Sequence, residues 1–348
     1  CARRDAEYPQ SGPQHIGCRA AGASHRAVGP AGLHQDHGGP QRIVEVDDHD
    51  ARIGGDIEQM RYTDDRRFSL HQFSGHGEYQ DGYMEVRDLE FQTDDSHVKG
   101  WARLDYEELS DFTDFVNQVQ MEGAFTEAQV SSDEFISYIP EFPQFDQFEF
   151  KGDFEGLVND LRTTKVDAKL GSTHFYGDVK LQNSTDPSNL YIDAFVGRCA
   201  TVGEDLQRYL PQFLEGEIPN EVGLFTDVTF NGHFEGTLKD FNSEGSFQTN
   251  LGNLKADVTF NNLSDLSLAS YAGELDLNRF DLGALLSNED LGKVTAAGVV
   301  SGSGLTPESA SATLDVESSL VEFRKAEINN LAVEGVVEDR KFIGDFHI

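Results

Sequence analysis

The sequence predicts a mainly β protein, built as one elongated, curled sheet of repeating strands with a few short amphipathic helices. From about residue 148 onward, the chain consists of short runs in which apolar and polar side chains alternate, separated by Gly and Asn. Alternation at period two places the apolar side chains on one face of a strand. Glycines inside the runs weaken each strand but permit the bends that a curled sheet needs.

The alternating runs also repeat after about eighty residues. The segment 150–156 reads FKGDFEG, the segment 230–236 reads FNGHFEG, and Tyr191 falls opposite Tyr271 farther along. A third, shorter unit opens at Val294. One such unit cannot bury its apolar face alone, so we expect units that start near residues 148, 228 and 294 to stack into one continuous surface.

Between residues 61 and 147 the sequence predicts strands and a first short helix. Asp105 can cap that helix, with Glu108 three residues later and Leu104 and Leu109 as a hydrophobic staple. One apolar stripe follows at helical spacing: Leu109, Phe112, Phe115, Val116 and Val119.

A second helix is predicted from Ser131, with Glu134 at the third helical position and Val130 and Phe135 as its staple. It must end by Pro140. We expect both helices to cover the open end or an edge of the sheet, because an uncovered edge invites aggregation.

Composition excludes several functions. The formal net charge of −35 disfavours contact with phosphate backbones, so no nucleic-acid partner is expected. Cys1, Cys18 and Cys199 form no CxxC pair, which predicts neither a disulfide framework nor a thiolate metal site, and no cofactor is expected. No apolar run approaches the roughly 18 residues of a membrane span.

Residues 1–60 differ from the rest of the chain. They contain no Phe and no Lys, and they hold five of the eleven His. We interpret this stretch as out-of-frame or disordered sequence that lies outside the β structure. At the other end, strand alternation continues up to Ile348, and we expect the chain to be an internal piece of a longer protein.

Three stretches together resemble one known family. They are 89–100 (LEFQTDDSHVKG), the Phe-x-Gly-x-Phe-x-Gly repeats, and 279–286 (RFDLGALL) followed by 290–295 (DLGKVT). Their order resembles the AsmA-like superfamily, in particular its TamB-type (translocation and assembly module) members in Bacteroidetes-type bacteria. The resemblance covers roughly residues 61–348.

The resemblance implies a large envelope protein of outer-membrane biogenesis that crosses the periplasm and is anchored in the inner membrane by a helix outside this piece. Its repeats would form a β-groove with an apolar interior. Implied activities are phospholipid transport between the membranes and outer-membrane protein translocation and assembly. The implied partners are phospholipid acyl chains and, through a region beyond this piece, an outer-membrane barrel assembly protein.

A lipid path must be lined continuously by apolar side chains, because each acyl methylene exposed to water costs roughly 0.8 kcal/mol. The strand faces predict this lining: Phe148, Phe150, Phe154, Val179, Leu181, Val228, Phe230, Phe234, Val258, Phe260, Leu275, Leu277, Leu331 and Val333. The same residues also fit the core of a closed sandwich. The family resemblance favours the open groove.

A secreted structural or adhesive β-repeat protein without lipid cargo is the alternative, since it would share the alternation, acidity and glycines. Enzymatic activity is not expected. The sequence has no G-x-S-x-G elbow, no P-loop, no G-x-G-x-x-G and no H-E-x-x-H motif.

Overall fold

The computed structural model describes residues 17–19, 52–63, 69–136, 144–212, 218–306, 308–338 and 341–348. In these residues all strands belong to one 19-stranded sheet. The strands are β1 (Gly17–Arg19), β2 (Ile53–Thr63), β3 (Ser69–Gln80), β4 (Tyr83–Gln92), β5 (His97–Asp105), β6 (Gln120–Val130), β7 (Phe148–Leu157), β8 (Asp160–Leu170), β9 (Thr173–Gln182), β10 (Tyr191–Thr201), β11 (Val228–Thr237), β12 (Phe241–Thr249), β13 (Gly252–Asn261), β14 (Ser270–Asp281), β15 (Leu291–Ser303), β16 (Ser311–Phe323), β17 (Ala326–Ile328), β18 (Leu331–Glu338) and β19 (Lys341–His347).

The helices of the described residues are short. They are α1 (Phe115–Gln118), α2 (Asp133–Ile136), α3 (Gly203–Tyr209) and α4 (Leu282–Leu285), with 3-10 turns η1 (Leu109–Asp114), η2 (Pro187–Asn189), η3 (Leu210–Gln212) and η4 (Asn220–Leu224).

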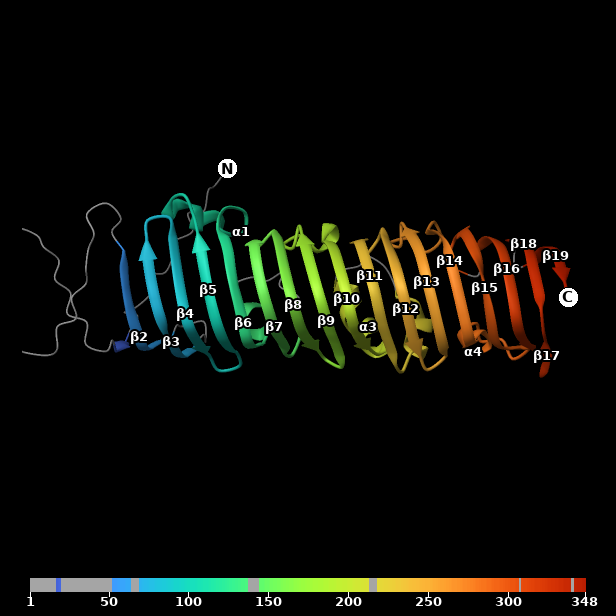
Figure 1. The fold of residues 1–348 in the computed structure, drawn as a ribbon, viewed down its shortest axis with the longest axis horizontal. Coiled ribbons are helices and arrows are strands. Elements are labelled where there is room, and N and C mark those ends of the chain that lie inside the picture. The colour runs from blue at the N-terminus through green and yellow to red at the C-terminus, as the bar shows by residue number, and fades with distance from the viewer. Residues whose placement is uncertain are drawn as a thin grey trace, which may run out of the picture.

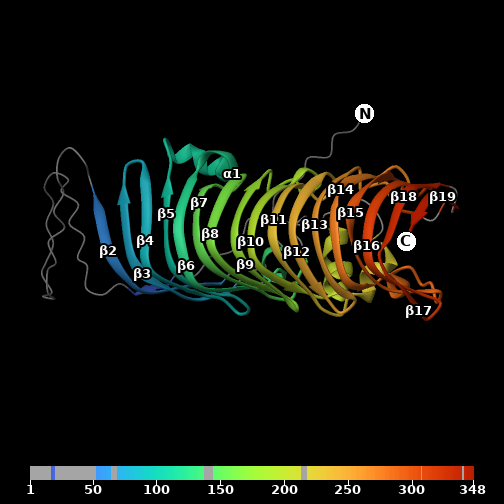
Figure 2. The ribbon, with the colours of Figure 1, turned by 45° about the vertical axis from the view of Figure 1, so that its right-hand side comes forward.

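From β2 to β16, each strand pairs antiparallel with the next one along the chain. The short β17 pairs with the end of β16, and β18 pairs with both β16 and β19. The result is a long ribbon of strands whose length runs across the strands (Figure 1). Figure 2 shows the strands bent along their own length. The predicted fold, a mainly β, elongated and curled sheet with few short helices, is confirmed.

The sequence repeat is also a structural repeat of four strands. β7 to β10 form one unit, β11 to β14 form the next, and α3 and α4 follow their last strands. Directly opposite residues connect Phe150 to Ala168, Phe175, Cys199 and then Phe230. Opposite residues on paired strands point to the same face, so Phe150 and Phe230 occupy equivalent places on one side of the sheet. The third unit begins with β15, a few residues before the predicted start at Val294.

Glycines on the neighbouring strands make room for the aromatic rings of the Phe-x-Gly-x-Phe repeats. A Cβ atom on Gly245 would lie 2.6 Å from Cε2 of Phe230, and one on Gly123 would lie 2.4 Å from Cζ of Phe154. Each ring therefore lies across a glycine of a neighbouring strand and covers the glycine backbone, which has no side chain of its own to shield it.

The boundary predicted at residue 60 is wrong. β2 begins at Ile53 and pairs with β3 as far as Tyr79, and β1 pairs with β2. The segment 53–57 carries apolar Ile53 and Ile57 at strand spacing, and the low Phe and Lys content of the whole stretch hid this pattern. Apart from β1, Arg52 and β2, the residues of the predicted atypical segment lie outside the described part of the chain.

The first predicted helix exists but starts later than expected. Asp105 does not cap it, because this residue ends β5, pairs with Gln120 and accepts hydrogen bonds from Arg103. The helical segment starts at Leu109, and the carboxylate of Asp111 accepts from the backbone N–H of Glu108 at 3.0 Å. Leu109, predicted on the apolar stripe, is 59% exposed.

The second predicted helix, α2, is also present, but Glu134 does not turn back to its cap. Its carboxylate accepts hydrogen bonds from the hydroxyls of Thr93 (2.7 Å) and Ser96, in the turn between β4 and β5. We expected both helices to cover the open end or an edge of the sheet, but neither covers an edge strand. Each lies in the connection between two interior strands: α1 between β5 and β6, and α2 between β6 and β7. The side chain of Phe135 lies outside the described part.

Four strands later, α3 anchors the sheet in the same way. Asp205 is buried and accepts hydrogen bonds from the backbone N–H of Ser172 (2.7 Å) and the hydroxyl of Thr173 (2.9 Å), in the turn between β8 and β9. Glu134, which follows β6, and Asp205, which follows β10, therefore each fix the turn between the two strands that precede the adjoining strand.

Replacing Asp205 by Ala should lower the free energy of unfolding by about 1–3 kcal/mol, because it removes a buried carboxylate that accepts hydrogen bonds from the backbone N–H of Ser172 and the hydroxyl of Thr173. Urea denaturation followed by circular dichroism measures this change. Glu204→Ala, at the exposed neighbouring position of α3, is the matched control and should change stability by less than about 0.5 kcal/mol. Equal effects of the two variants would contradict the anchoring role.

Candidate functional site

A row of directly opposite residues runs across the sheet from β2 to β18. It consists of Met60, Phe73, Phe91, Val98, Ala128, Phe150, Ala168, Phe175, Cys199, Phe230, Phe247, Leu254, Leu277, Ala296, Ser318 and Leu331. Ser318 is its one alcohol, and that hydroxyl donates to the carbonyl oxygen of Thr295 at 2.9 Å. We call the side of the sheet that carries this row the apolar face, and the opposite side the polar face.

The strand registers place every predicted lining residue on the apolar face. Phe148 and Phe154 flank Phe150 at period two on β7, and Val179 and Leu181 share a face with Phe175 on β9. The others follow the same rule on their own strands: Val228, Phe230, Phe234, Val258, Phe260, Leu275, Leu277, Leu331 and Val333. All of them are half-buried, neither enclosed nor fully exposed.

This intermediate burial follows from the single layer. All described strands lie in one sheet, so in this part of the chain no second sheet packs on the apolar face. The fully buried apolar side chains of the described residues are mostly Ala and Val, and Phe280, at 3% exposure, is the one buried phenylalanine among them. The apolar face is therefore unlike a closed sandwich core, in which large side chains are enclosed on all sides.

Aromatic rings on the apolar face contact one another across strands. Phe230 stacks on Phe247 at 4.5 Å between ring centroids, and Phe241 lies 4.8 Å from Phe234 and 5.3 Å from Phe260. Four more phenylalanines of the apolar face are not among the predicted lining residues: Phe125, Phe175, Phe241 and Phe247. They alternate with polar neighbours along their strands. This alternation identifies them once the register shows which alternate positions of each strand point to the apolar face.

Cys199 carries the one thiol in the row of the apolar face. Burial raises the pKa of the Cys199 thiol, which disfavours the nucleophilic thiolate. In the described residues, no three His, Cys, Asp or Glu side chains gather closely enough to hold a metal ion. The same part of the chain contains no helix long and apolar enough to cross a membrane.

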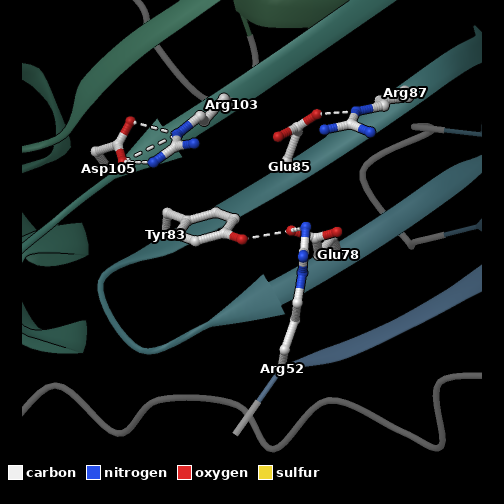
Figure 3. A network of polar contacts seen from close by, with 7 residues as sticks. All are labelled: Arg52, Glu78, Tyr83, Glu85, Arg87, Arg103 and Asp105. Atoms are coloured by element: carbon white, nitrogen blue, oxygen red, sulfur yellow. Dashed lines mark hydrogen bonds and ion pairs between the residues drawn. The ribbon is translucent and has the colours of Figure 1, made fainter. Parts of the chain in front are cut away.

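The polar face carries charged side chains, which are paired in the first strands. Figure 3 shows the network on β3 to β5, and its ion pairs are Arg52–Glu78, Arg87–Glu85 and Arg103–Asp105. Hydrogen bonds from Arg52 and Tyr83 lower the pKa of the Glu78 carboxyl. A hollow of about 860 Å³ beside Trp101 opens among these charges, so it belongs to the polar face.

Comparisons of the chain with protein-family models, with curated proteins and with solved structures found no match.

Truncation of Phe230 to Ala should cost only about 1–2 kcal/mol, because one side of its ring has no packed protein neighbour. Phe280→Ala is the control, since it removes an enclosed ring and should cost about 3–5 kcal/mol. Equilibrium unfolding in urea gives both values. A cost for Phe230 as large as that for Phe280 would show that the apolar face is a closed core.

Proposed function

We propose that this chain is part of a large envelope protein whose curled sheet forms an apolar groove for phospholipid acyl chains between the inner and outer membranes. The observation that carries the proposal is the row of buried and half-buried side chains from β2 to β18, which is apolar except at Ser318, whose hydroxyl donates to a backbone carbonyl oxygen within the sheet. The apolar face is less exposed than the polar face along β12 and β13.

Continuity is what an acyl chain requires. A sixteen-carbon chain exposed to water costs on the order of 12 kcal/mol, so a charged or unsatisfied polar side chain in the row would create a barrier. Across the sheet, opposite residues repeat at about 4.8 Å, which is short enough for a moving chain to contact the next apolar side chain before it leaves the last.

The size of the repeat also fits this cargo. Four strands extend over about 19 Å, and one leaflet of a bilayer core is about 15 Å thick. One repeat therefore accommodates roughly one extended acyl chain.

The cellular part of the proposal is supported by the resemblance to the AsmA-like superfamily. In this proposal the chain lies in the periplasm and is held to the inner membrane by a segment outside this piece. It also has a part in outer-membrane biogenesis, through phospholipid transport or outer-membrane protein assembly with a barrel partner. In this proposal the protein binds and guides cargo and is not an enzyme.

Phe230→Glu tests the groove directly. Because the apolar face is open on one side, a carboxylate at this position can remain hydrated, and the variant should be recovered folded and monomeric. Its lining would carry a charge in the middle of the row, so the amount of co-purifying phospholipid should fall several-fold, measured by lipid extraction and mass spectrometry.

Gln248→Glu is the matched control, because it adds the same charge at an exposed position of the polar face, next to Phe247 in the sequence. Its phospholipid content should equal that of the unchanged protein. Loss of folding in Phe230→Glu alone would favour a closed core. Folded variants with equal lipid content, or an unchanged protein without lipid, would favour a structural or adhesive protein without cargo.

A further inference from the structure

The polar face contains a second feature that is unrelated to the apolar row. A hollow of about 980 Å³ crosses the strands from β10 to β16. Two apolar side chains are exposed within it, Phe195 on β10 (61% exposed) and Val299 on β15 (48% exposed). Exposed aromatic and aliphatic side chains inside a concave surface are typical of a docking surface.

One row of directly opposite residues forms the length of this hollow. We call the row the docking row, and it consists of Phe195, His233, Glu244, Asp257, Glu274, Val299 and Asp315. At about 4.8 Å per strand, it extends over about 29 Å, which is the length of an extended segment of about nine residues. Its shape therefore fits a polypeptide strand that lies across the sheet.

An aromatic pair forms one end of the row. The ring of Phe195 stacks on the imidazole of His233 at 4.4 Å between centroids, and His233 is held in place by Asp193 at 2.8 Å. The exposed side of Phe195 is thereby fixed in orientation. Such a ring attracts a Lys or Arg side chain through its negative face.

The charges beside these apolar residues are unbalanced. Glu244, Asp257 and Glu274 are directly opposite one another on three neighbouring strands, although like charges in such positions repel. None of the three forms an ion pair with any other described residue. Lys255 is the one Lys or Arg among the described residues that line the hollow.

The first half of the polar face differs in this respect. On β7 and β8, Glu149 pairs with Lys169 at 3.1 Å and Asp153 pairs with Lys165 at 2.7 Å. Carboxylates on β7 and β8 are thus neutralised by neighbouring lysines, whereas the three carboxylates of the docking row are not. A partner that carries positive charge would relieve the repulsion there.

From the exposed aromatic ring, the length of the hollow and its charge, we infer that the docking row binds an extended, basic polypeptide segment of a partner protein. Arg or Lys side chains of the segment face the three carboxylates, and Phe195 and Val299 contact its apolar or cationic side chains. A single metal ion fits less well, because no group of described acidic side chains is close enough to ligate one.

The test uses the full chain and a labelled nonapeptide in which Arg and Ser alternate, with fluorescence anisotropy at physiological salt. In the triple variant Glu244→Gln, Asp257→Asn and Glu274→Gln, binding should weaken by about ten-fold or more. The charge-matched control is Glu149→Gln, Asp153→Asn and Glu155→Gln on β7, and its affinity should stay within about two-fold. Circular dichroism checks that both triples remain folded.

The aromatic contact has its own pair of variants. Phe195→Ser should weaken the peptide several-fold, whereas Tyr176→Ser, at a similarly exposed aromatic residue outside the hollow, should not. Equal loss in the two charge triples would overturn the inference in favour of unspecific attraction to an acidic protein. Absence of peptide binding would also overturn it, as would stoichiometric binding of Ca²⁺ that displaces the peptide. None of these outcomes bears on lipid content, so the inference and the proposed groove can fail separately.

Discussion

The structure depends on one constraint, the cross-strand register that keeps large apolar side chains on the same side of a single-layer sheet. Side chains alternate along a strand, so a slip of one residue would turn the whole apolar set of a strand to the other face. In a two-layer protein, the second layer would specify the register by packing. Here that role falls to contacts between neighbouring strands, such as the stack of Phe230 on Phe247 and the rings that lie over Gly245 and Gly123.

The connections between strands support the same register. Glu134 and Asp205, four strands apart, each fix the turn of a nearby hairpin from outside the sheet. Successive connections also contact each other, since Arg208 forms an ion pair with Asp146 at 2.9 Å. These contacts lie at the ends of the strands, so they stabilise the curled ribbon and leave the middle of the apolar face uncovered.

Part of this arrangement could be predicted from the sequence, because face and repeat are local properties. Alternation alone places Phe148, Phe150 and Phe154 on one side of a strand, and the matched segments at 150–156 and 230–236 indicate the four-strand repeat. Alternation could not assign Cys199. An irregularity between Val196 and Cys199 changes the parity within β10, and only the register shows that Cys199 shares a face with Phe230.

Other features arise from contacts between distant residues. The local capping signal at Asp105 predicts a helix start, but strand pairing and the hydrogen bonds from Arg103 hold that residue in β5. The docking row combines one side chain from each of seven strands, so no short motif could reveal it. In the first case strand pairing overrides a local signal. In the second, strand pairing brings together residues that are far apart in the sequence.

The central claim is that the apolar face, and not the polar face, contacts acyl chains. Photo-cross-linking with a phospholipid that carries a diazirine in its acyl chain, resolved to single residues by mass spectrometry, tests it most directly. The account predicts labels on Phe150, Phe230 and Leu277 and none on their immediate neighbours Lys151, Asn231 and Asp276. Equal labelling of the two sets, or labelling that does not saturate with lipid concentration, would contradict it.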